Sequence, residues 1–175
     1  MKNSSQLRKQ TGFTLIEVLI SALVLVVGVL GVAALQVTAL KNLQSSGNHG
    51  VASMMANDIS DRMWVNQAQA LAGAYNHNGL PNAVPKDCVA ETCTEAEMAA
   101  YDVYEWQRQL LGYTTESGVA VPAMLPSGAG TVALDAGTTY EITIRWDDDR
   151  SGSTQTNCPP QSDNDLDCYV VTVTF

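Results

Sequence analysis

GFTLIE, at residues 12–17, opens the apolar stretch that decides how the rest of this 175-residue chain can fold. Residues 18–40 contain no charged side chain. A run of roughly 20 apolar residues can cross a bilayer as a helix, and residues 13–40 would extend roughly 42 Å at about 1.5 Å per residue. Three bases and no acid precede the stretch, at Lys2, Arg8 and Lys9. Basic residues ahead of such a helix stay in the cytoplasm, so the rest of the chain is expected on the outer side of the membrane.

One carboxylate, Glu17, lies within the apolar stretch. An ionisable group in or near the apolar phase is costly, and it suggests a function with a specific charged partner. Two plainer interpretations compete with this one. The stretch could be a secretory signal with Ala33 and Ala34 near its cleavage site, but the apolar core of a signal is only about 7–15 residues long. It could also be a membrane anchor in which Glu17 has no role.

The GFTLIE string, preceded by a short basic leader and followed by an apolar helix, resembles the type IV pilin and pseudopilin family. The resemblance implies that a prepilin peptidase cuts between Gly12 and Phe13 and then methylates the new amino group of Phe13. It also implies that the Glu17 carboxylate pairs with the N-terminal amine of a neighbouring subunit during assembly. A buried ion pair loses heavily when one partner is missing, so this pair would set the register of packed helices more than it adds stability.

The same resemblance divides the chain into three parts. Residues 1–12 are the prepilin leader, residues 13–40 the hydrophobic transmembrane and assembly helix, and residues 41–175 a periplasmic pilin-like globular domain. The implied location is the inner membrane, with the N-terminus in the cytoplasm, and later the pilus at the cell surface. The implied partners are other minor pilins, the major pilin, the prepilin peptidase, the inner-membrane assembly machinery and, before assembly, the lipid bilayer.

Composition and motifs exclude several other functions. Without the leader, the chain has six Lys and Arg residues and eighteen Asp and Glu residues. Nucleic-acid binding, in contrast, needs a basic surface. We find no set of nucleophile, base and acid, no glycine-rich phosphate loop and no pair of histidines at metal spacing. The sequence therefore predicts a structural protein rather than an enzyme, with no cofactor and no nucleic-acid partner.

The cysteines predict two disulfides, because their number is even and the expected compartment is oxidising. Local pairs, Cys88 with Cys93 and Cys158 with Cys168, are favoured because each pair bounds its own short loop. Their spacing does not match the usual zinc patterns. The acidic run 147–149 begins like a calcium loop, but position twelve of such a loop would be Cys158 rather than Glu. No metal site is predicted, and a solvated acidic loop is the favoured interpretation of this run.

Periodicity predicts that the helix continues through residues 41–71, with a weak point at residues 45–47. One apolar face recurs at steps of three and four residues and consists of Leu40, Leu43, Gly47, Val51, Met54, Met55, Ile59 and Met63. Residues 73–93 are rich in turn signals and predict a loop in which His77 is solvated. Thr94 and Glu97 then predict a capping box that opens a second helix, which ends at Leu111 before Gly112. The predicted core positions of this helix are Ala99, Tyr101, Val103, Tyr104, Trp106 and Leu110.

The remaining sequence predicts strands at residues 118–125, 131–134, 139–146 and 168–175. The last two alternate between apolar and polar residues, which indicates one buried face for each strand. The predicted fold is therefore α+β and pilin-like, with a long N-terminal helix packed on an antiparallel β-sheet and a second, shorter helix.

Three further stretches resemble the PilV group of minor pilins, the type IV pilus modification proteins. They are GVLG-x-A-x-LQ at residues 28–36, T-x3-MA-x2-D-x3-W at residues 94–106, and RWDD at residues 145–148. This finer resemblance implies a minor pilin that initiates the assembly of a type IV pilus or forms its tip, and so contributes to twitching motility and attachment. An I-type minor pseudopilin of a type II secretion system shares the N-terminal string. A tip adhesin whose cysteine-bounded loops contact a surface also remains open.

Overall fold

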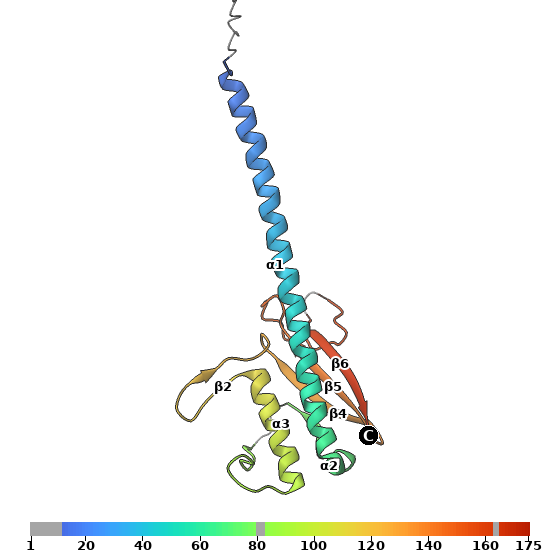
Figure 1. The fold of residues 1–175 in the computed structure, drawn as a ribbon. Coiled ribbons are helices and arrows are strands. Elements are labelled where there is room, and N and C mark those ends of the chain that lie inside the picture. Colours follow the sequence, from blue (N-terminus) through green and yellow to red (C-terminus); the bar gives the residue numbers. More distant parts are fainter. Residues whose placement is uncertain (1–11, 80–82, 163–164) are drawn as a thin grey trace, which may run out of the picture. The chain divides into compact units, whose positions relative to one another are not determined.

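A computed structural model describes residues 12–79, 83–162 and 165–175 (Figure 1). Most of the predicted leader, Pro81 of the predicted loop, and Asp163 and Asn164 lie outside the described residues. The chain divides into two compact units, Met1–Leu43 and Gln44–Phe175. The long helix α1, Leu15–Val65, contributes residues to both units.

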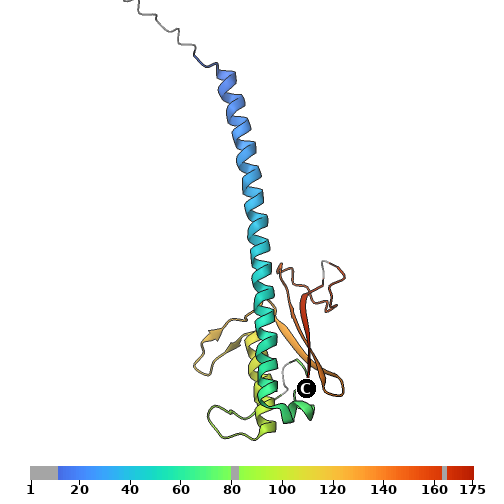
Figure 2. The ribbon, with the colours of Figure 1, turned by 45° about the vertical axis from the view of Figure 1, so that its right-hand side comes forward.

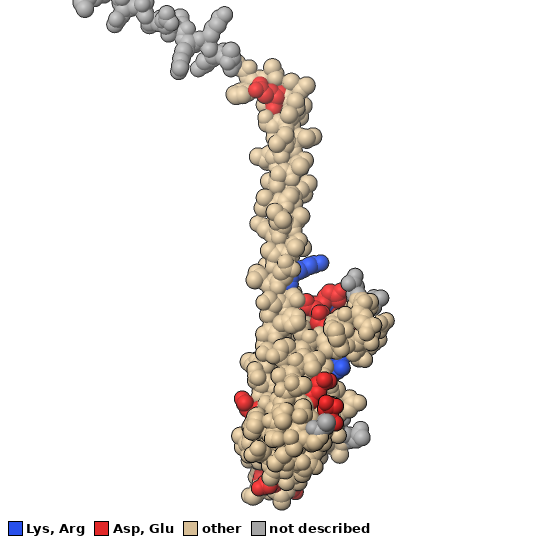
Figure 3. Space-filling view, turned by 90° about the vertical axis from the view of Figure 1, so that its right-hand side faces the viewer, with Lys and Arg blue, Asp and Glu red and all other residues tan. Residues whose placement is uncertain are grey.

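In the first unit, every described residue is exposed. Residues 18–40 present an uncharged surface, which Figure 3 shows as an uninterrupted tan stretch. Among the described residues, α1 alone is long and apolar enough to cross a membrane. An apolar helix surface of this length is stable in lipid or against other helices, because in either place it is removed from water.

α1 continues through residues 45–47 without a break, so the predicted weak point does not interrupt it. A glycine in a helix interior costs only about 1 kcal/mol relative to alanine, and the helical turns on both sides supply the hydrogen bonds. The first interruption comes at Asn66, and the short helix α2, Gln67–Leu71, follows.

The buried face of α1 in the second unit differs in part from the predicted one. The residues that α1 buries are Ala52, Met55, Ala56, Ile59 and Met63. Four predicted positions, Leu40, Leu43, Gly47 and Met54, are exposed. The predicted face was defined mainly by large apolar side chains. The face that packs includes two alanines, Ala52 and Ala56.

The main sheet has four antiparallel strands in the order β1–β4–β5–β6. They are β1, His77–Asn78; β4, Ala129–Ala136; β5, Thr139–Trp146; and β6, Asp167–Thr174. The predicted apolar face of β5 is confirmed, because Tyr140, Ile142, Ile144 and Trp146 are fully buried. The opposite face is less regular than predicted, because Thr143 is buried as well. In β6, Tyr169, Val171 and Val173 pack against the same core. β4 is longer than its prediction at residues 131–134.

His77 is not simply solvated, as the sequence analysis expected. It lies in β1, where it pairs with Val132 of β4, and its side chain is half-buried. This burial lowers the pKa of His77 below its ordinary value. A strand of two residues gives no periodic signal, so β1 could not be recognised within the predicted loop.

The helix α3, Glu95–Leu111, runs alongside the later part of α1 in both Figure 1 and Figure 2. Its predicted bounds are confirmed, as are the core positions Ala99, Val103, Trp106 and Leu110. The Trp106 Nε1–H donates to the Met55 carbonyl at 2.8 Å, and the Gln107 amide donates to the Gly130 carbonyl at 2.6 Å. These two bonds tie α3 to α1 and to β4 within the buried core.

The predicted core positions Tyr101 and Tyr104 are only half-buried. They lie on a second side of α3, which faces a short hairpin of β2, Tyr113–Thr114, and β3, Ala120–Val121. The strand predicted at residues 118–125 is thus shorter than expected, and β2 was not predicted. With the helices and the main sheet placed, the structure confirms the pilin-like α+β fold: a long N-terminal helix packed on an antiparallel sheet, with a second, shorter helix.

A polar network crosses the interface between α1 and α3. The Tyr75 hydroxyl donates to Asp102 at 2.8 Å, and Arg62 donates to the other Asp102 oxygen at 3.2 Å and to Asp58 at 3.1 Å. Burial, together with the bond to Asp102, raises the pKa of Tyr75. All these groups are paired, which is what buried polar atoms require.

Candidate processing and assembly site

The predicted processing site lies immediately before α1. A Cβ added to Gly12 would meet no atom within 4 Å, and the φ of Gly12 lies outside the left-handed region. The fold of this chain therefore gives no reason for a glycine at position 12. A residue without a side chain leaves the backbone open to close approach by another molecule.

Thr14 starts the helix. Its carbonyl accepts the Glu17 N–H at 3.1 Å and the Val18 N–H at 3.3 Å, and its hydroxyl lies 3.4 Å from the same Glu17 nitrogen. A threonine in this place satisfies backbone N–H groups that a helix leaves unpaired at its first turn. Thr14 was not predicted from the sequence, although Thr14-x-x-Glu17 has the same spacing as the capping box recognised at Thr94 and Glu97.

Glu17 lies in the first turn of α1 and is exposed. Its carboxylate has no hydrogen-bond or ion-pair partner among the described residues. The positive end of the helix dipole favours a negative charge in this turn. The carboxylate therefore lies exposed at the positive end of the helix dipole.

Two glycines later in α1 leave its surface open. A Cβ added to Gly28 or to Gly31 would meet nothing within 4 Å. Neither glycine is therefore required by packing within this chain. Glycines at such positions allow another helix to approach the backbone closely.

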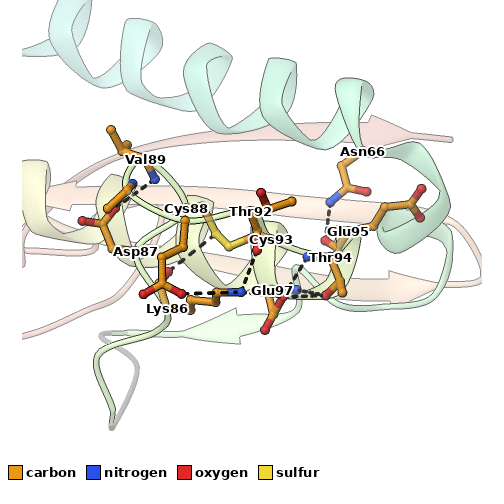
Figure 4. Close-up of a disulfide and its surroundings, with 12 residues drawn as sticks. Asn66, Lys86, Asp87, Cys88, Val89, Thr92, Cys93, Thr94, Glu95 and Glu97 are labelled. Carbon is orange, nitrogen blue, oxygen red and sulfur yellow. Dashed lines mark hydrogen bonds and ion pairs between the residues drawn. A yellow bond between two sulfur atoms is a disulfide. The ribbon is translucent and has the colours of Figure 1, made fainter.

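Both predicted cysteine pairs are joined in the structure. Cys88–Cys93 has a Cα–Cα distance of 5.4 Å, and Cys158–Cys168 has one of 6.0 Å. The first crosslink lies directly before the start of α3 (Figure 4). The second attaches the preceding loop to β6, in which Cys168 lies.

At the start of α3, side chains and backbone groups hydrogen-bond to one another (Figure 4). The Glu97 carboxylate accepts the Thr94 N–H at 2.7 Å, and the Thr94 hydroxyl accepts the Glu97 N–H at 3.3 Å. Lys86 donates to the Thr92 carbonyl at 2.6 Å and lies 3.8 Å from the Glu97 carboxylate. The bonds to Thr94 hold the pKa of Glu97 below its ordinary value. The predicted capping box is confirmed, and the disulfide loop is fixed onto it.

The acidic loops use carboxylates to hold their own backbone. Asp147 accepts the Ser151 N–H at 3.0 Å and the Gly152 N–H at 2.8 Å. Asp165 accepts the Gln161 N–H at 2.8 Å and the Asn157 amide at 2.9 Å. In the part of the chain that the structure describes, no group of three or more His, Cys, Asp or Glu is arranged to hold a metal ion.

Two family models match adjoining stretches of the chain. Residues 7–33 match the prokaryotic N-terminal methylation motif, and residues 34–104 match the family described as type IV pilin Tt1218. Comparisons with curated proteins and with solved structures returned no significant match. The motif implies processing by a prepilin peptidase and assembly with pilus partners in general. Pilins are structural subunits rather than enzymes. The chain is therefore a type IV pilin-like protein with an N-terminal methylation motif and a hydrophobic N-terminal helix.

Proposed function

We propose that this chain is a minor pilin of the PilV kind, which takes part in initiating the assembly of a type IV pilus or in forming its tip. The observation that carries the proposal is the Glu17 carboxylate. It is held in the first turn of an apolar helix, within the residues that match the methylation motif, and it has no partner among the described residues. A group in this position requires a cationic partner once the helix is removed from water.

Processing supplies that partner. Cleavage by the prepilin peptidase between Gly12 and Phe13 creates an amino terminus four residues before Glu17, and methylation of Phe13 leaves its nitrogen cationic. In the assembled filament, the Phe13 amine of one subunit pairs with Glu17 of a neighbour. The exposed surface at Gly28 and Gly31 supports close packing between the same helices.

The proposed location follows from the N-terminal bases and the disulfides. Residues 1–12 form the leader, residues 13–40 cross the inner membrane with the N-terminus in the cytoplasm, and residues 41–175 lie in the periplasm. Crosslinked cysteines suit that oxidising compartment. The partners are other minor pilins, the major pilin, the assembly machinery of the inner membrane and, before assembly, the bilayer.

Replacing Glu17 tests this proposal. Glu17→Val should give stable, membrane-inserted protein, because it removes a charge from an apolar segment. It should also leave the neighbour's amine unmatched, at a cost of several kcal/mol. We therefore expect poor recovery of Glu17→Val with partner pilins when the protein is affinity-purified from membranes at equal abundance.

Ser21→Ala is the matched control, because it removes a hydroxyl one turn later. Among the described residues, this hydroxyl bonds only to the Glu17 carbonyl, at 2.7 Å. This variant should be recovered with partners as well as the wild type. Equal recovery of Glu17→Val and Ser21→Ala would show that Glu17 is not an assembly contact, and the chain would then be an anchored periplasmic domain.

A second candidate is an I-type minor pseudopilin of a type II secretion system. The motif at residues 7–33 favours it as much as it favours a pilin, since the physics of the N-terminal helix is the same in both machines. A tip adhesin is the third candidate, with the loops bounded by the two disulfides as its contact surface.

A further inference from the structure

A cleft of about 530 Å³ lies beside α3 in the second unit. Its walls are one side of α3, the start of the β2–β3 hairpin, and the loop that contains Val84 and Asp87. Figures 1 and 2 show that hairpin next to α3. We call it the tyrosine cleft, because three tyrosines line it: Tyr101, Tyr104 and Tyr113.

The α3 side of the tyrosine cleft is a regular helical face. Four of its residues are spaced three or four positions apart, which places them on one side of the helix. They are Tyr101, Tyr104, Glu105 and Arg108. The core face of α3 is separate, because Trp106 and its buried neighbours use the remaining positions. α3 therefore has two faces with a regular helical spacing of residues, and packing in the core accounts for only one of these faces.

Arg108 is fully engaged within the cleft. Its Nη1 donates to Glu105 at 2.6 Å, and its guanidinium lies 3.8 Å from the centre of the Tyr113 ring and 5.3 Å from that of Tyr104. The guanidinium thus holds β2 against α3 and is neutralised by Glu105. Its charge is not available to attract an anion.

The charge that remains in the cleft is negative. Asp87 and Glu116 also line it, and neither has a cationic partner among the described residues. The Asp87 Oδ1 accepts the Val89 N–H at 2.9 Å and the Ala90 N–H at 3.2 Å, so Glu116 is the more open of the two carboxylates. Burial, and next the nearby Glu105 and Asp87 carboxylates, raise the pKa of Tyr101. Its hydroxyl therefore stays protonated and adds no negative charge of its own to the cleft. A concave surface with one sign of charge concentrates ions of the opposite sign.

Aromatic rings together with carboxylates that lack a cationic partner are the chemistry that binds ammonium and guanidinium groups, through cation–π attraction and charge-assisted hydrogen bonds. We propose that the tyrosine cleft is a binding site for an organic cation, either a lysine or arginine side chain of a partner protein or a free polyamine. A cleft of this volume is within the usual range for sites that hold a small molecule. The proposal is independent of the pilus function, because it involves no residue of the N-terminal helix.

The test is calorimetric titration of the full-length protein in neutral detergent. The probes are spermidine, a lysine-containing peptide, N-acetyl-lysine methylamide and, as an anionic comparison, N-acetyl-glutamate methylamide. Glu116→Gln removes a carboxylate that is exposed and unpaired among the described residues, so folding is not at risk. Asp61→Asn is the matched control, since Asp61 is an equally exposed acid on α1 away from the cleft.

We expect the cationic probes to bind the wild type, and Glu116→Gln to raise their Kd about fivefold, which corresponds to about 1 kcal/mol. Asp61→Asn should leave the Kd unchanged, and added salt should weaken binding. Tighter binding of spermidine than of the peptide would identify a free polyamine as the source, and the reverse a protein side chain. The proposal is overturned if no cationic probe binds, if the glutamate compound binds equally well, or if the two variants have equal effects.

Discussion

Gly130 occupies a position in β4 where no side chain fits. A Cβ built on it would overlap the Trp106 ring and lie 2.7 Å from a Leu110 methyl group. Both neighbours are fully buried, so neither can move aside freely. We expect Gly130→Ala to lower the free energy of unfolding by about 1–3 kcal/mol, the usual range for overpacking.

Gly50→Ala is the control for this prediction. Gly50 lies within α1, and an added Cβ would meet nothing within 4 Å. The same substitution should therefore raise the free energy of unfolding, by up to about 1 kcal/mol, because alanine is the better helix former. Urea unfolding followed by circular dichroism measures both variants. Changes of the same sign would contradict the packing described around Trp106.

Gly12 should tolerate a large side chain in the folded chain but not in processing. We expect Gly12→Leu to accumulate as full-length precursor in the inner membrane, because the peptidase can no longer reach the backbone closely. Gly31→Ala, a substitution within α1, should be processed normally. Intact-mass analysis distinguishes the two forms. Mature wild-type protein that begins elsewhere than Phe13 would refute the proposed cleavage site.

At the level of the element, the stability contributed by the capping box at the start of α3 should depend on pH. The folded pKa of Glu97 is lowered, chiefly by its bonds to Thr94, so its contribution to stability is present above its ordinary value of 4.5. That contribution is lost as the pH falls from there through the folded pKa. Glu97→Gln keeps a capping acceptor that does not titrate. The difference in melting temperature between wild type and Glu97→Gln should shrink below pH 4.5 and stay constant above it.

The elements differ in how well the sequence predicted them. β5 and α3 were located correctly because each is long enough for its apolar residues to show the periodicity of a strand or a helix. In addition, Thr94 and Gly112 mark the ends of α3. The strands β1, β2 and β3 have two residues each and no period, so they depend on pairing with distant residues. On α1, Ala52 and Ala56 were missed because alanine is common on both buried and exposed helix faces. At the candidate site, Gly12, Phe13 and Glu17 came from the motif, whereas Thr14 was missed although its spacing to Glu17 is that of a capping box.

At the scale of the whole molecule, the machine that uses this protein can be identified by deleting its gene. If the chain is a minor pilin, we expect loss of surface pili and of twitching motility, with protein secretion unchanged. Electron microscopy, motility assays and exoprotein measurements separate these outcomes, and complementation with the wild-type gene and with Glu17→Val provides the controls. Lost secretion with normal pili would instead indicate a pseudopilin, and lost attachment with normal pili an adhesin.

Both disulfides connect near neighbours, at sequence separations of 5 and 10 residues. Closing a short loop in an unfolded chain costs less entropy than closing a long one, so the native partners are also the ones that meet most often. Cys88 and Cys93 are also synthesised well before Cys158 and Cys168, so a chain that is oxidised as it is exported can form its first pair before any wrong partner exists. Oxidative folding of this protein should therefore proceed from the N-terminal pair to the C-terminal pair, with little need for an isomerase to exchange mispaired thiols.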